Sequence, residues 1–195
     1  MRFHNAGKYD GDESKLPQRE HEKNTVPFRE PSLKQLAVIA NIGAFLTIAL
    51  CCVPVFMRGA GTISSKANAL SIGAILSLVT LVPHEFLHGL CFREDVYMYS
   101  NLKQGMMFVV GTEDMSRGRF VFMSLLPNCV FGLLPYVVFL LFPRLTVLGM
   151  MGAFCIGMGF GDYINVFNAL TQMPKGAKTY LSGTHSYWYM PESAE

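Results

Sequence analysis

The chain has 195 residues, of which 51% are apolar and only 15% are charged, against about 25% charged residues in an ordinary soluble domain. This shortage of charge argues against a freely soluble cytosolic enzyme, and the five cysteines lie in apolar runs, which excludes a disulfide scaffold. Sixteen Lys and Arg residues oppose fourteen Asp and Glu residues, a net charge of +2, and so there is no strongly basic character to suggest a nucleic-acid partner, and none is expected.

The first segment, residues 1–35, mixes both signs of charge with Gly and Pro and has no amphipathic period. Such a composition does not bury enough apolar surface to order a chain, so we expect a mobile cytoplasmic tail. The segment is too long and too acidic for the leader of a cleavable signal peptide. Residues 36–195 are then expected to form one membrane domain.

Four stretches after the tail are almost free of charge, and each is long enough to cross a hydrocarbon core of about 30 Å at about 1.5 Å per helical residue. They are residues 36–57, 67–92, 120–143 and 145–170. We therefore predict an all-α polytopic membrane protein with four transmembrane helices. Two β-prone runs between the second and third spans, residues 96–99 and 106–110, predict a small cytoplasmic β-hairpin.

The positive charges outside the spans predict the orientation of the protein. Thirteen Lys and Arg residues lie on the side of both termini and the long middle loop, and three lie on the other side. Because positively charged loops stay cytoplasmic, both termini are expected in the cytoplasm. The absence of organelle-targeting features favours the plasma membrane of a bacterium. The aromatic residues after the last span, at position 180 and within residues 185–189, are expected to lie at the membrane interface.

The second span contains the sequence PHEFLHG at residues 83–89, which matches the pattern H-E-x-x-H. Residues four apart share one face of a helix, so His84 and His88 can bind a single ion while Glu85 remains beside it as a base. Ionisable groups inside a membrane span are costly and usually functional. The alternative is that the histidines form hydrogen bonds with neighbouring helices and Glu85 is a protonated structural group.

A hydrolytic zinc site usually has three protein ligands and one open position, so a third ligand is expected at the same depth. Asp162 is the only other ionisable acid in any predicted span, and it lies as far into the fourth span as His84 lies into the second. In the alternative interpretation, Asp162 pairs with a polar neighbour such as Asn165. Two imidazoles and one carboxylate suit a single Zn²⁺ per chain best, although iron or manganese can bind the same groups.

The chain resembles the zincin peptidase family of small membrane proteins in three features: the motif at residues 83–89, Gly161-Asp162 before an apolar helix, and the arrangement of four spans. That family is similar to the site-2 protease group of intramembrane zinc metalloproteases, and the resemblance covers residues 36–190. It implies that His84, His88 and Asp162 hold zinc and that Glu85 activates a water molecule. It also suggests that an extended substrate adds a strand to the edge of the hairpin. In the site-2 group glycine follows the aspartate, whereas Tyr163 follows here.

The expected function is hydrolysis of a peptide bond, in or near the bilayer, in a membrane protein or peptide substrate. Stabilising the developing oxyanion needs further hydrogen-bond donors, and the alternative use of each candidate is bonding between helices. The candidates are Asn128, Asn165, Asn168 and His185. Rival functions are a catalytically inactive membrane protein that binds a metal or a client, a zinc hydrolase of a lipid amide or small molecule, and, more weakly, a divalent-metal carrier.

Overall fold

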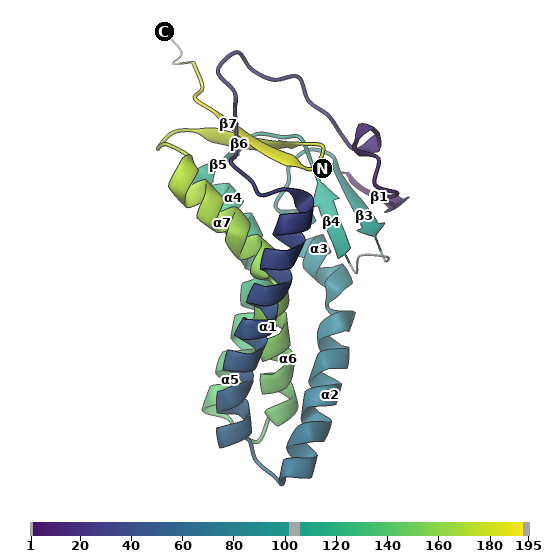
Figure 1. Cartoon of the computed structure of the whole chain (residues 1–195), viewed down its shortest axis with the longest axis vertical. Coiled ribbons are helices and arrows are strands. Elements are labelled where there is room, and N and C mark those ends of the chain that lie inside the picture. Colours follow the sequence, from purple (N-terminus) through teal and green to yellow (C-terminus); the bar gives the residue numbers. More distant parts are fainter. Residues whose placement is uncertain (1, 102–105, 193–195) are drawn as a thin grey trace. The chain divides into compact units, whose positions relative to one another are not determined.

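The computed structural model describes residues 2–101 and 106–192. Its helices are η1 (Glu13–Lys15), α1 (Leu33–Arg58), α2 (Ile63–Val79), α3 (Leu81–Leu90), α4 (Arg117–Pro127), the π-helix η2 (Asn128–Leu133), α5 (Leu134–Leu141), α6 (Thr146–Met158) and α7 (Phe160–Gln172) (Figure 1). Its strands are β1 (Phe3–Lys8), β2 (Val26–Pro27), β3 (Val96–Asn101), β4 (Met106–Val110), β5 (Met115–Ser116), β6 (Lys178–Ser182) and β7 (His185–Tyr189).

The chain divides into two compact units, each built from segments that are distant in the sequence. The mixed unit consists of Met1–Glu30, Glu85–Ser124 and Asn165–Glu195, and it contains all of the strands. The helical unit consists of Pro31–His84 and Leu125–Ile164. Three of the four divisions fall inside helices α3, α4 and α7, and the fourth, between Glu30 and Pro31, precedes α1.

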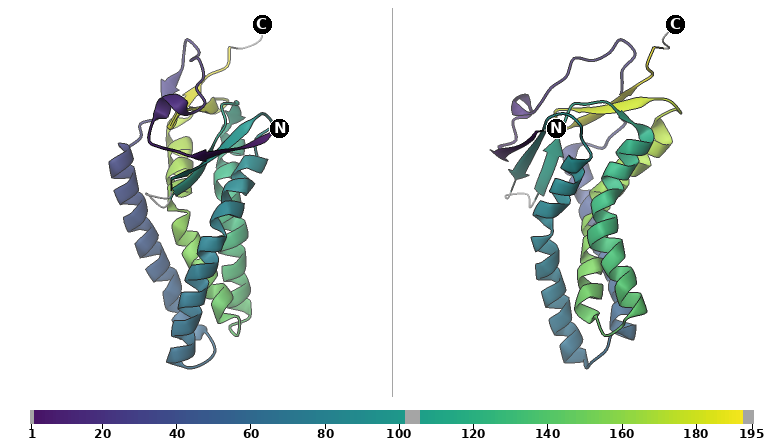
Figure 2. Two further views of the ribbon diagram at one scale, coloured as in Figure 1. Left: turned by 90° about the vertical axis from the view of Figure 1, so that its right-hand side faces the viewer. Right: turned by 180° about the vertical axis from the view of Figure 1, so that it is seen from behind.

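In the helical unit, α1, α2, α5 and α6 run side by side, and α6 packs against each of the other three (Figures 1 and 2). Its core includes Val55, Phe139 and Met150, which are fully buried. Glycines in α6 bring the backbones close together: a Cβ at Gly152 would lie 2.7 Å from the Tyr136 nitrogen of α5. Small residues at such contacts are typical of helices that pack in lipid.

The outer surface of α1 is strongly apolar. Phe45, Leu50 and Met57 are 71%, 73% and 78% exposed, which is unusual for so many large apolar side chains on one helix in water. Within the described residues, two helical stretches, Lys34–Arg58 and Arg117–Leu141, are long and apolar enough to cross a membrane. The number rises to four if each of two bent helix pairs forms one span.

The two bent pairs correspond to the second and fourth predicted spans. Helices α2 and α3 meet at 41°, and the break at Thr80 follows from Pro83, whose ring clashes with the carbonyl four residues earlier, that of Val79. Helices α6 and α7 meet at 47° around Gly159. The sequence pattern therefore located both apolar segments, and Pro83 marks the first break, whereas the break at Gly159 was not predicted.

The mixed unit holds two sheets. One has the order β1-β3-β4, with β1 parallel to β3 and β3 antiparallel to β4 (Figure 2). The antiparallel pair is the one predicted at residues 96–99 and 106–110. The first two residues of the predicted connection, 100 and 101, belong to β3, and its other residues, 102–105, lie outside the described residues. The other sheet has the order β2-β7-β6-β5, and residues such as Phe28, Phe92, Val96, Met115 and Phe120 form the buried core of this unit.

The prediction of an all-α protein is wrong, because the described residues contain seven strands in two sheets. Strands β1 and β2 lie within the segment expected to be a tail, and β6 and β7 lie where only interfacial aromatics were expected. Four of the six residues of β1 are exposed and do not alternate with apolar residues, so the period-two signal of a strand is missing. This strand depends on its distant partner β3, which local pattern cannot reveal.

Candidate metal centre

Helix α3 carries both histidines and the glutamate of the H-E-x-x-H pattern. Ligand atoms of His84, Glu85 and His88 all lie within 4.8 Å of one another. Glu85 and His88 are buried, and the His84 side chain is only 17% exposed. The helical spacing of one and four residues thus gathers three potential ligand atoms in a mostly water-excluded position.

In the helical unit, Asp162 at the start of α7 lies against His84 of α3. The distance from His84 Nε2 to Asp162 Oδ2 is 3.2 Å, and the aspartate side chain is 16% exposed. Two tetrahedral ligands held about 2.0–2.1 Å from a zinc ion lie about 3.3 Å apart, so these two atoms are spaced as zinc ligands are. The structure therefore brings together the acid and the imidazole that the sequence analysis paired by depth.

His88 has a backbone partner that fixes the orientation of its ring. Its Nδ1 lies 2.9 Å from the carbonyl oxygen of Met123 in α4, and only a protonated Nδ1 can donate to a carbonyl. The neutral ring then carries its lone pair on Nε2, where a metal can bind. Metal-ligating histidines usually have such an outer partner, so the His88 environment fits a metal ligand. Met123 was not predicted as a partner of His88, because a backbone acceptor leaves no side-chain signal in the sequence.

Asn128 also reaches Asp162. Its Nδ2 donates a hydrogen bond of 2.7 Å to Asp162 Oδ2, the same oxygen that faces His84. Asn128 begins the π-helix η2, in which the Leu134 N–H donates to the Cys129 carbonyl five residues earlier. Pro135 lacks an N–H group and so favours this wider turn, and π-helical turns are frequent at functional sites.

The other candidate donors have different surroundings. Asn165 is half-buried, and Asn168 is buried and accepts a hydrogen bond of 3.0 Å from Gln172 Nε2. His185 is exposed on β7, where its Nδ1 lies 3.4 Å from Glu30. A role of these three residues in binding substrate stays a prediction.

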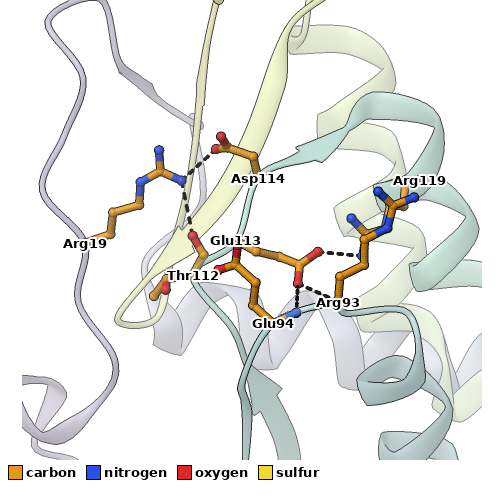
Figure 3. A pocket seen from close by; sticks show the side chains of 7 residues that line it. All are labelled: Arg19, Arg93, Glu94, Thr112, Glu113, Asp114 and Arg119. Carbon is orange, nitrogen blue, oxygen red and sulfur yellow. Dashed lines mark hydrogen bonds and ion pairs between the residues drawn. The ribbon is translucent and has the colours of Figure 1, made fainter. Parts of the chain in front are cut away.

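A polar cavity of about 480 Å³ lies in the mixed unit (Figure 3). It is lined by Arg19, Arg93, Glu94, Thr112, Glu113, Asp114 and Arg119. On one side the Arg19 guanidinium forms an ion pair of 2.6 Å with Asp114 and donates to the Thr112 carbonyl. Burial alone would lower the pKa of the Arg19 guanidinium, but its hydrogen bond to Asp114 has the opposite effect, and the pKa is raised.

On the other side of this cavity, Glu113 anchors the chain just after α3 (Figure 3). One of its carboxylate oxygens accepts hydrogen bonds from the backbone N–H groups of Arg93 and Glu94, each at 2.6 Å. The other forms a 2.5 Å ion pair with Arg119, which also donates to the Cys91 carbonyl. The pair therefore fastens the carboxyl end of the helix that carries His88. Arg119 was used in the sequence-based prediction only as a cytoplasmic positive charge, and its contact with Glu113 was not predicted.

Replacing Arg119 by Ala is expected to destabilise the protein by about 3–5 kcal/mol, because it leaves the buried Glu113 carboxylate without its counter-charge. The measurement is the free energy of unfolding in detergent. Arg93→Ala is the matched control, since the Arg93 side chain is exposed and forms no ion pair with the residues described. Equal stability of the two variants would show that the Glu113–Arg119 pair contributes nothing.

Comparison with known proteins identifies the family of the chain. The sequence model of a family described as Putative zincin peptidase matches residues 77–178, which is just over half of the chain. The matched segment includes the whole of α3, Asn128 and Asp162. No curated protein and no solved structure matches the chain.

Proposed function

The chain belongs to the Putative zincin peptidase family, and from this we propose that it is a zinc metallopeptidase that cleaves a peptide bond in or near a lipid bilayer. The observation that carries the proposal is the 3.2 Å approach of Asp162 to His84 on the helix that also holds Glu85 and His88. One carboxylate and two imidazoles are a donor set that suits Zn²⁺.

His84, His88 and Asp162 would hold one zinc ion per chain. The donor set fits on three counts: the His84–Asp162 spacing, the Nδ1 hydrogen bond that leaves Nε2 of His88 free of a proton, and the shielding of all three groups from water. A zinc ion bound there would lower the pKa of a water molecule towards neutrality and polarise the scissile carbonyl. Three protein ligands would leave one ligand position open for this chemistry.

Glu85 is the proposed general base. It follows His84 directly, so it lies one position further round the helix, and its carboxylate is within 4.8 Å of the ligand atoms of both histidines. At that distance the carboxylate can accept a proton from a water molecule as the water attacks the carbonyl carbon. It then delivers the same proton to the leaving nitrogen, so that a single residue serves as base and acid.

The membrane setting rests on the apolar helices. Two to four of the described helical stretches are suited to span a bilayer, and α1 exposes large apolar side chains along its length. We propose a multi-pass protein with both termini in the cytoplasm, in the plasma membrane of a bacterium, from the distribution of Lys and Arg. The substrate would then be a membrane protein or a membrane-associated peptide.

Removing the metal from the protein and returning it tests this function. The detergent-solubilised protein is incubated with a mixture of quenched fluorescent peptides before chelation, after chelation and after addition of Zn²⁺. We expect chelation to abolish hydrolysis and stoichiometric Zn²⁺ to restore it. Hydrolysis that survives complete removal of metal would contradict the proposal.

Two further outcomes separate the rival functions. A zinc-loaded protein that cleaves no peptide in detergent or in liposomes would favour a metal- or client-binding protein without catalysis. Release of fatty acid from a lipid amide, with every peptide left intact, would favour a hydrolase of small molecules.

A further inference from the structure

We propose that Asn128 is a positioning residue that fixes the carboxylate of Asp162 towards His84, and that Gly159 is required because it leaves room for the Asn128 side chain. The inference rests on the proposed function, in which Asp162 is a zinc ligand. It differs from the role expected from the sequence, where Asn128 is a candidate donor to the substrate oxyanion.

The hydrogen bond from Asn128 is directed at one oxygen of Asp162. Nδ2 of Asn128 lies 2.7 Å from Oδ2, and Nε2 of His84 lies 3.2 Å from that same atom. Because an amide NH₂ group can only donate, the bond holds this carboxylate oxygen as an acceptor and restrains rotation of the carboxylate plane. The amide adds no charge, so it orients Asp162 without neutralising it.

Because Asn128 is buried, its side chain has little freedom to move away from Asp162. Asn128 is only 4% exposed, so its amide cannot turn towards water when its contact with Asp162 is disturbed. It belongs to the π-helical turn that follows Pro127, and it comes from a different predicted span than Asp162. A partner of this kind behind a metal ligand typically changes metal affinity by about 10- to 100-fold.

Gly159 lies where α6 ends and contacts both residues. A Cβ at this position would overlap the side-chain oxygen and carbon of the Asn128 amide. The Gly159 carbonyl also accepts the Asp162 N–H at 3.0 Å. A Cβ at Gly161, by contrast, would have no described atom within 4 Å apart from those of its own stretch of helix. The same small change, Gly to Ala, is therefore expected to displace the amide at one position and to be tolerated two residues later.

The experiment compares Asn128→Ala, Gly159→Ala, the double variant and Gly161→Ala. Zinc affinity is measured in detergent by competition with a chromophoric chelator, and the metal geometry is followed by the visible absorption spectrum of the Co²⁺-substituted protein. We expect Asn128→Ala and Gly159→Ala each to weaken zinc binding by about 10- to 100-fold and to alter the Co²⁺ spectrum. Gly161→Ala should match the wild type in both measurements.

The double variant distinguishes a shared mechanism from two separate defects. Because Gly159→Ala acts by displacing the Asn128 amide, adding it to Asn128→Ala should weaken zinc binding no further. Wild-type affinity and an unchanged Co²⁺ spectrum in folded Asn128→Ala would overturn the inference and leave the proposed function intact. Additive losses in the double variant would overturn the role of Gly159. A wild-type protein that binds no zinc would instead overturn the proposed function, and this inference with it.

Discussion

Glu85→Gln is expected to lower the rate of peptide hydrolysis by about 10²- to 10⁴-fold while the protein keeps its zinc. Glutamine has nearly the shape of glutamate but cannot accept a proton, so the substitution removes the base and leaves His84 and His88 in place. The measurement combines turnover of the quenched peptides with zinc content of the same sample. The loss should appear in kcat, because a general base acts in the transition state.

Glu94→Gln is the matched control for this prediction, because Glu94 is an exposed acid that lines the polar cavity. It should retain wild-type turnover. A Glu85→Gln protein with wild-type turnover would exclude Glu85 as the base. Loss of zinc in that variant would instead identify Glu85 as a ligand, which its position within 4.8 Å of the histidine ligand atoms allows geometrically.

Asp162→Ala is expected to weaken zinc binding strongly, because it removes one of three ligands. The loss of affinity should exceed the factor of about 10 to 100 that is typical when a residue hydrogen-bonded to a metal ligand is removed. Two imidazoles remain, and they hold the ion without the charge of the carboxylate. Turnover at micromolar zinc should fall with occupancy. Zinc affinity by chelator competition is the appropriate measurement, since it does not depend on the identity of the substrate.

Asn165→Ala is the control for Asp162→Ala. If Asp162 were a structural group paired with Asn165, the two substitutions would have similar effects on stability and neither would change zinc binding. The structure pairs Asp162 with His84 and Asn128, so only Asp162→Ala should lose zinc. Unchanged zinc affinity in Asp162→Ala would show that the third ligand is another group.

Most of the helices could be predicted from the sequence, because long runs of apolar residues limit the chain to helical structure. The antiparallel pair of β3 and β4 was also visible, since two short β-prone runs flank polar residues. Pro83 is a sequence signal for a kink near Thr80, whereas the break at Gly159 could not be predicted, because composition does not show where a helix changes direction.

The sheets depend on partners that are far apart in the sequence. β1 pairs with β3 across about ninety residues, and β2 pairs with β7 across a still longer separation. Such pairing is decided by tertiary packing, which overrides the local propensity of an exposed and polar segment. For this reason residues 1–35 carried no sequence signal of the two strands within them.

The sequence predicts which residues form the site better than it predicts how they are arranged. The spacing of His84, Glu85 and His88 follows from helix geometry alone, and the depth of Asp162 pointed to His84. The contacts of Asn128 and His88 with their partners could not be foreseen. They depend on a π-helical turn and on a backbone carbonyl, and neither has a recognisable pattern in the sequence.

The most direct test of the central claim is the zinc content of the purified, detergent-solubilised protein, measured by elemental mass spectrometry beside His84→Ala. We predict close to one zinc per chain in the wild type and in Glu85→Gln, and almost none in His84→Ala. A wild-type protein that contains no zinc, and takes up none when it is added, would contradict the assignment of this chain as a zinc metallopeptidase.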